Sequence, residues 1–129
     1  MKKYFLVAGS LFGLTAVILG AFGAHALEKI LDTAALDSFE TGVRYQMYHA
    51  LLLLLVGTFN FLSEKSQKII FYLLLFGIIL FSGSIYLLVL FELTQIALLT
   101  PLGGGLLIVA WVVLLITALK KTGKTEKSS

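Results

Sequence analysis

Four long apolar runs dominate this chain, and short polar segments separate them. The runs cover residues 4–24, 45–62, 69–91 and 96–119. A helix needs about 20 apolar residues to cross the hydrocarbon core of a bilayer, and each run is close to that length. The runs are rich in leucine and lack the alternation of a barrel strand, which favours helices. The pattern therefore predicts an all-α, polytopic integral membrane four-helix bundle in residues 1–119, followed by a basic cytoplasmic tail at 120–129.

Composition supports membrane insertion. Hydrophobic residues make up 59% of the 129 residues, and the mean hydropathy is +1.00, well outside the range of soluble globular proteins. The chain has no cysteine, which excludes disulfide frameworks and thiolate metal sites. Its net charge of +3 owes much to the tail "LKKTGKTEKSS", so the basic balance does not indicate nucleic acid. We expect the lipid bilayer as a partner, and no nucleic acid, metal or cofactor.

Lysine and arginine are distributed unevenly between the two ends of the predicted helices. One side carries Lys2, Lys3, Lys65, Lys68, Lys120, Lys121, Lys124 and Lys127, and the other carries Lys29 and Arg44. Cytoplasmic flanks of membrane helices are enriched in these residues. We therefore expect a multi-pass protein of the bacterial inner (plasma) membrane with both termini in the cytoplasm. The acidic connector after the first helix, and Glu92, then face outward.

The first run ends in "GAFGAHALEK", where Ala24-His25-Ala26 has the small-x-small form of a signal-peptidase site. Two features favour a retained helix instead. The run exceeds the ~7 to 15 apolar residues of a secretory signal. Its small residues also recur along one helical stripe, which lets another helix approach closely. The stripe consists of Gly9, Gly13, Ala16, Gly20 and Ala24.

The connector after the first helix is amphipathic. Its apolar residues Leu27, Ile30, Leu31 and Ala34 stand at i, i+3, i+4 and i+7. This spacing predicts a short helix lying in the outer membrane interface. Asp37 and Ser38 are then candidate caps for the second membrane helix.

The second helix opens with a polar face. In "FETGVRYQMYHALLLLL", Glu40, Arg44 and Tyr48 share one row, and Thr41, Tyr45 and His49 share the next. If hydrocarbon begins near Tyr45, His49 lies one turn deep, where a titratable group is a functional candidate. A structural alternative stays open, in which the tyrosines anchor at the interface, Arg44 pairs with Glu40, and His49 donates to a carbonyl.

The third and fourth runs carry "LFSGSIYLL" and "TPLGGG". Hydroxyls in membrane helices usually bond to their own backbone or to a neighbouring helix. Thr100 is a natural N-cap, with Pro101 at the first helical position. The glycines favour close helix packing, and the segment lacks the context of a phosphate-binding loop.

These polar groups all fall toward the outer ends of the helices, which predicts a shallow outward-facing pocket. The candidate pocket residues are His25, Glu40, Arg44, Tyr45, Tyr48, His49, Ser82, Ser84, Tyr86 and Thr100. Gly83, Gly103 and Gly104 join the stripe of the first helix as candidate helix-packing residues.

In their order and spacing, "GAFGAHAL", "FETGVRYQMYHALLLLLVG", "LFSGSIYLL" and "TPLGGG" resemble the YgdD/YwdK-like family of small bacterial inner-membrane proteins, which has relatives in eukaryotes. The resemblance covers the chain except for its charged tail. It implies a four-helix integral membrane protein of unknown function, and it supplies no catalytic residues.

Three functions compete. The first is a non-enzymatic bundle that binds a partner membrane protein, a second copy or a lipid, or aids assembly, and it requires only packing surfaces. The second is a small oligomeric transporter or channel, which is weakened because no acidic residue lies near the middle of a helix. The third is a haem or redox site ligated by His25 and His49. Hydrolysis by Ser82 or Ser84 lacks a strained nucleophile turn, so we favour the first.

Overall fold

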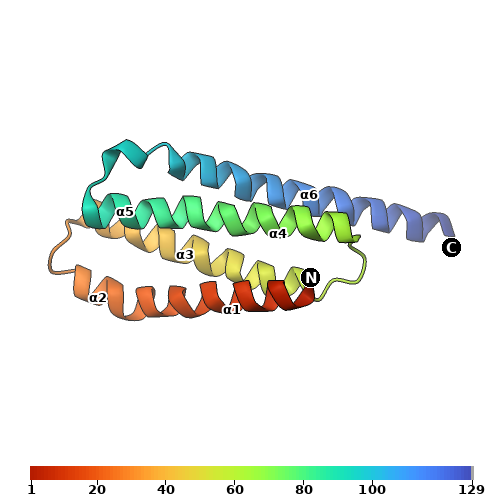
Figure 1. Ribbon diagram of the computed structural model, residues 1–129, viewed down its shortest axis with the longest axis horizontal. Helices are drawn as coiled ribbons and strands as arrows, with labels where there is room; N and C mark the ends of the chain where they lie inside the picture. Colours follow the sequence, from red (N-terminus) through yellow and green to blue (C-terminus); the bar gives the residue numbers. More distant parts are fainter. Residues whose placement is uncertain (129) are drawn as a thin grey trace.

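Four long helices run side by side in the computed structural model, which describes residues 1–128 and the side chains of residues 1–121. Successive helices run in opposite directions, and both termini lie at the same end of the bundle (Figure 1). Short turns join the helices, and the described residues contain no strand. The predicted all-α membrane bundle is therefore confirmed in its architecture.

The first long helix is continuous over 26 residues, Lys2–Leu27. It comprises α1 (Lys2–Ile18), a π-helical segment η1 (Leu19–Gly23) and α2 (Ala24–Leu27). The structure has a turn where the sequence predicts an interfacial helix over 27–34. The amides of Ile30 and Leu31 bond back to the carbonyl of Leu27, which closes this turn. The next helix begins at Thr33, so the intervening segment is too short to form a helix of its own.

The second long helix, α3 (Thr33–Val56), begins and ends earlier than the predicted span at 45–62. Its N-cap is Asp32, whose carboxylate accepts from the amide of Ala35 at 2.8 Å, so Asp37 and Ser38 are not the caps. The helix stops before residues 57–62, although these are mostly apolar. Within them, Leu62 is buried against the core, so this apolarity reflects burial at the end of the bundle rather than a helix.

The third long helix comprises α4 (Glu64–Ile78), the π-helical segment η2 (Ile79–Gly83) and α5 (Ser84–Phe91). Ser63 caps its start by accepting from the amide of Ser66. The helix ends at Glu92, which has a left-handed backbone with φ of 54° and is the only non-glycine residue described with positive φ.

A short 3-10 turn, η3 (Thr94–Ile96), leads to the fourth long helix, α6 (Leu99–Ser128). The helix begins before Thr100, so Thr100 is inside the first turn rather than at the N-cap. Pro101 is still in that turn, where its missing N–H removes no intrahelical bond. α6 also continues into the segment expected to be a tail, and the side chains after residue 121 lie outside those described.

Three of the long helices are long and apolar enough to cross a membrane: Lys2–Leu27, Glu64–Phe91 and Thr94–Lys121. The helix α3 is not among them, since its first half carries charged and amide side chains. It packs against α1, α4, α5 and η2. Protein contacts therefore cover Gln46 and His49 of α3, which lipid would not tolerate, whereas Glu40 and Arg44 lie at the surface of the acidic end.

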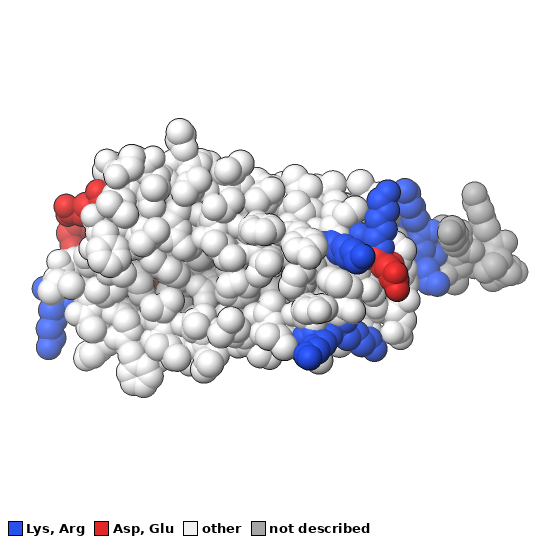
Figure 2. Space-filling view, in the orientation of Figure 1, with Lys and Arg blue, Asp and Glu red and all other residues white. Residues whose placement is uncertain are grey.

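Charged side chains gather at the two ends of the bundle and leave an uncharged band between them (Figure 2). We call the end that holds both termini the lysine end and the opposite end the acidic end. The described residues of the lysine end are Lys2, Lys3, Glu64, Lys65, Lys68, Lys120 and Lys121. The acidic end carries Glu28, Lys29, Asp32, Asp37, Glu40, Arg44 and Glu92. Large apolar side chains such as Leu14 and Leu115 are exposed along the band, as expected of a surface that meets lipid.

The small residues of the first helix lie against α3. A Cβ added at Gly9 would come within 2.8 Å of Leu54, and one added at Gly20 would come within 3.2 Å of Val43. Ala16, which lies between these two glycines in the sequence, is buried. The stripe therefore lets α1 and α3 pack at close range. Gly13, Gly23 and Ala24 are partly buried on the same helix.

The helix α6 packs most tightly at Gly103. A Cβ there would lie 2.3 Å from the backbone nitrogen of Phe81 in η2. The Cβ of a residue at Gly104 would meet only the Phe81 ring, at 3.5 Å, and one at Gly83 would meet nothing within 4 Å. Close packing is thus a property of Gly103, and the structure assigns no such role to Gly83.

Candidate functional site

The predicted pocket residues do not converge on one site, because they lie on different sides of α3. Some bond between helices, some lie at the surface near the acidic end, and some line a groove between α3 and α6. The bonding group is His49, Ser82, Ser84, Tyr86 and Thr100. The surface group is His25, Glu40, Arg44, Tyr45 and Tyr48.

His49 joins α3 to α6. Its Nδ1 lies 2.7 Å from the carbonyl oxygen of Tyr45 and donates to it, while its Nε2 accepts from Trp111 Nε1 at 3.1 Å. These two partners require the neutral ring with the proton on Nδ1. With 5% of its surface exposed, the imidazole has neither ring nitrogen free for a metal or substrate.

The two histidines are far apart along the bundle. His25 is exposed in α2, close to Gly23, whose Cβ position is 3.2 Å from the Phe39 ring. His49 is roughly ten residues further along α3 than Phe39, or about 15 Å of helix. They therefore cannot share one haem iron. Among the described residues, no group of three His, Cys, Asp or Glu could hold a metal ion either.

Gln46 joins three helices and was missing from the predicted pocket. Its Nε2 donates to the carbonyl of Phe12 at 2.8 Å and to Thr15 Oγ1 at 2.7 Å. Its Oε1 accepts from the hydroxyl of Tyr86 at 2.7 Å. The sequence did indicate this role, because Gln46 lies next to the polar rows of α3 and its amide needs hydrogen-bond partners inside a membrane.

The serines of the third helix also hold the bundle together. Ser82 Oγ donates to the carbonyl of Gly42 at 2.7 Å, and this hydroxyl is buried. Ser84 Oγ is hydrogen-bonded to Thr100 Oγ1, which connects α5 with the start of α6. No buried side-chain nitrogen or oxygen among the described residues lacks a partner.

The ion pair of α3 lies at the surface. Arg44 Nη1 is 4.0 Å from Glu40 Oε2, with about half of each side chain exposed, and Arg44 Nη2 donates to Thr41 Oγ1 at 3.3 Å. An exposed pair of this kind contributes little to stability. Arg44 and Glu40 border a notch of about 230 Å³ beside Gly20 and Ala24. The notch is on the α1 side of α3, away from His49.

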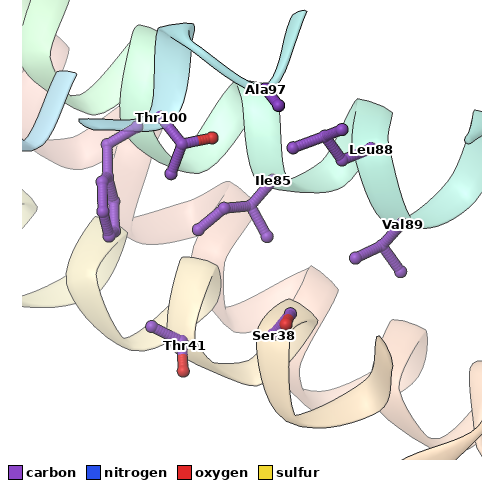
Figure 3. Close-up of a pocket in the computed structure, with 8 residues that line it drawn as sticks. Ser38, Thr41, Ile85, Leu88, Val89, Ala97 and Thr100 are labelled. Carbon is purple, nitrogen blue, oxygen red and sulfur yellow. The ribbon is translucent and has the colours of Figure 1, made fainter. Parts of the chain in front are cut away.

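A lateral groove lies between α3 and α6 and extends from the acidic end toward Trp111. Two cavities of about 420 and 400 Å³ adjoin, because both are lined by Thr41 and Phe81. In Figure 3, Ala97 and Thr100 lie across the gap from Ser38 and Thr41. The lining residues of the two cavities are Ser38, Thr41, Tyr45, His49, Phe81, Ile85, Leu88, Val89, Ala97, Thr100, Gly104, Leu107, Ile108 and Trp111.

Small residues line both walls of this α3–α6 groove near the acidic end, whereas its deeper part is lined by large side chains of α3 and α6, and its floor is apolar. Ser38 and Thr41 of α3 are on one wall, and Thr100 and Gly104 of α6 are on the other, together with Ala97 in the turn before α6. Phe81 and Ile85, from η2 and α5, lie between the walls. The hydroxyl of Thr41 is held by the carbonyl of Asp37, and that of Thr100 by Ser84. The arrangement suits packing of an apolar group better than acid-base chemistry.

Comparisons with known proteins agree with the membrane fold. The model of a family described as "Protein of unknown function (DUF423)" matches residues 19–104. A UPF0382 membrane protein of Staphylococcus saprophyticus is 42% identical over 118 residues, which are 92% of this chain and 98% of that protein. The UPF0382 membrane protein YwdK of Bacillus subtilis is 41% identical over 123 residues, with the same coverage.

A more distant relative is a UPF0382 membrane protein of Haemophilus influenzae, which is 38% identical over 112 residues, or 87% of this chain and 90% of that protein. No solved structure matches the chain. The resemblance of the four motifs to the YgdD/YwdK-like family is confirmed by these matches, and the chain belongs to the DUF423 family, whose members compared here are named membrane proteins.

Proposed function

We propose that this protein is a non-enzymatic membrane bundle that binds a transmembrane helix of a partner protein in the α3–α6 groove. The observation that carries this function is the set of small residues that face each other across the part of the groove near the acidic end. Interfaces between membrane helices are enriched in Gly, Ala, Ser and Thr, because small side chains let two backbones approach. Ser38, Thr41, Ala97, Thr100 and Gly104 meet that description.

The contacts within the chain support this use of small residues. α6 already packs on η2 through Gly103, where no Cβ fits. The neighbouring Gly104 faces the groove, where a Cβ would make only ordinary contact with the Phe81 ring. A further helix could therefore meet α6 through Gly104 without displacing any contact inside the bundle.

The bonds of the polar side chains support binding rather than catalysis. Both ring nitrogens of His49 are used, and the hydroxyls of Ser82 and Ser84 are taken up between helices. A nucleophile needs an adjacent base that can receive its proton. These groups instead connect neighbouring helices, which is the role expected of polar side chains that hold a membrane bundle together.

The charge distribution supports a defined orientation. With the lysine end in the cytoplasm, both termini are cytoplasmic and all four helices pass through the inner membrane. The α3–α6 groove, near the acidic end, then opens toward the outer leaflet. Transport is the weaker alternative, because Leu53, Ile70 and Leu74 are packed in the core on the lysine side of the polar groups.

Site-specific photocross-linking tests the partner helix. A photoreactive phenylalanine analogue replaces Ile108, which lines the groove and is 65% exposed, or Leu115, two turns further along α6 and 58% exposed. We expect one defined partner protein cross-linked at position 108 and not at 115. Gly104→Leu should fill the groove and abolish the product. Gly105→Leu is the matched control, because a Cβ at Gly105 meets nothing within 4 Å.

Three results would contradict partner binding in the groove. The first is the same mixture of proteins cross-linked at positions 108 and 115, which would indicate chance collisions. The second is a product that survives Gly104→Leu. The third is a cross-link at 108 to lipid alone, measured as the mass of the adduct, which would make the groove part of the lipid-facing surface.

A further inference from the structure

A second groove lies along α4 and begins at the lysine end. It has a volume of about 400 Å³ and shares no lining residue with the α3–α6 groove. Its lining residues are Lys68, Ile69, Tyr72, Leu73 and Phe76 of α4 and Leu106 of α6. The α4 residues recur about one helical turn apart, so the groove follows one face of the helix from the bundle's end toward its middle.

The walls of this groove differ from those of the α3–α6 groove. Every lining side chain is large, and none is Gly, Ala, Ser or Thr. A helix backbone cannot approach closely over such side chains. Tyr72 and Phe76, with about half of their surfaces exposed, have stacked rings 6.2 Å apart with an interplanar angle of 19°. They form a flat apolar wall against which a flexible hydrocarbon chain can lie.

Charge at the mouth of the groove identifies the kind of lipid. Lys68 is the only charged residue that lines the groove, and it lies where the groove begins at the lysine end. Around it the described residues of this end carry five further lysines and one acid, Glu64. Lys68 forms no ion pair with a carboxylate of the described residues. A lysine stem lying on apolar side chains places its ammonium at the level of the headgroups, where phosphate is found.

We propose that the groove along α4 binds one acyl chain of an anionic phospholipid, whose headgroup phosphate contacts Lys68. The occupant is a lipid rather than a helix because the walls are large and the mouth is basic. This site is independent of the partner helix proposed for the α3–α6 groove. Loss of one therefore leaves the other testable.

Native mass spectrometry of the full-length protein in mild detergent measures the headgroup preference. The protein is titrated with phosphatidylglycerol, and separately with phosphatidylcholine of the same acyl chains. We expect Lys68→Gln to lower phosphatidylglycerol binding about fivefold, the effect of removing about one favourable charge near a lipid surface. Lys68→Arg should preserve binding. Lys65→Gln, on the same helix end but outside the groove, should leave binding within about twofold of wild type.

A photoactivatable phosphatidylglycerol with its reactive group in the acyl chain locates the chain itself. Cross-links should map to residues 69–76 and Leu106, and Lys68→Gln should reduce them. If Lys65→Gln and Lys68→Gln lowered phosphatidylglycerol binding equally, the positive charge of the whole lysine end would explain the binding. That result would overturn the site. Cross-links spread evenly over other exposed faces, such as Leu11 and Leu14 of α1, would overturn it as well.

Discussion

At Gly103, one absent Cβ decides how close two helices come. A Cβ there would lie 2.3 Å from the backbone nitrogen of Phe81 and 2.7 Å from the carbonyl carbon of Leu80. Backbone atoms cannot rotate aside as the end of a side chain can. We therefore expect Gly103→Ala to destabilise the protein by about 1–3 kcal/mol, the usual range for overpacking. Unfolding of the purified protein in detergent, followed by circular dichroism, measures this change.

Gly105, two residues further along α6, supplies the control for that substitution. A Cβ at Gly105 has open space around it, so Gly105→Ala should be neutral or should stabilise the helix by up to about 1 kcal/mol. Equal effects at positions 103 and 105 would show that helix propensity, and not the contact with η2, decides the outcome.

At the same scale, the sequence locates the polar side chains along each helix, but it predicts only some of their hydrogen-bond partners. The structural alternative kept for Arg44 and His49 anticipates their bonds, to Glu40 and to the carbonyl of Tyr45. The bond from Trp111 to His49 joins residues 62 positions apart and has no local signature. The single pocket was inferred from depth along the helices, whereas the rotation of each helix decides which side of α3 a residue faces.

At the scale of elements, polar bonds connect α3 to α1, η2, α5 and α6. The bond from Trp111 to His49 is the one that reaches α6, and a double-mutant cycle isolates it. Trp111→Phe removes the donor, His49→Phe removes the acceptor, and the double variant removes both. We expect a coupling energy of about 0.6 kcal/mol, and not above about 1.7, the range measured between membrane helices. Unfolding in mixed micelles provides the free energies.

Additive single effects in that cycle would mean that the two rings only fill space beside each other. Their centroids are 6.0 Å apart with an interplanar angle of 72°, so a ring contact accompanies the hydrogen bond in the wild type. The cycle separates this packing from the hydrogen bond only if the rings of the two phenylalanines occupy the positions of the Trp111 and His49 rings in the wild type. A second donor, at Trp111→Tyr, should recover part of the coupling if its hydroxyl reaches the imidazole.

Helix boundaries were predictable where a local signal sets them, and not where tertiary contacts do. Apolar runs located the long helices, and Ser63 is a conventional cap for α4. The end of α3 was missed because residues 57–62 are apolar for a tertiary reason. Neither π-helical segment was foreseen. Each adds a residue to a turn and so shifts the faces of the helix beyond it, which changes where Ser84 and Tyr86 point.

At the scale of the whole molecule, the separation of charge predicts how the bundle sits in the membrane. Because the chain has no cysteine, single cysteines can report this without background. We expect Gln95→Cys, in η3 at the acidic end, to react with a membrane-impermeant maleimide in intact cells. Asn60→Cys, in the connector at the lysine end, should react only after the membrane is opened. Both positions are exposed, so access depends on the membrane alone.

The reverse pattern of labelling would place the lysine end outside. Labelling of both positions in intact cells would indicate insertion in two orientations, which the charge bias argues against. The cysteine-free wild-type protein is the background control, and unfolding of each variant in detergent checks that the bundle is unchanged.

The polar centre of α3 has a consequence for biogenesis. A nascent segment leaves the insertion channel for lipid according to its own hydrophobicity, and an arginine or aspartate near its centre opposes that step by about 2.5–3.5 kcal/mol. α3 carries such residues in its first half and falls short of the apolarity of the other three helices. Its partners in α1 are already synthesised when it emerges, whereas Tyr86 and Trp111 follow later. α3 should therefore leave the channel as a hairpin with α1, held at the channel's edge until the third and fourth helices cover its remaining polar side.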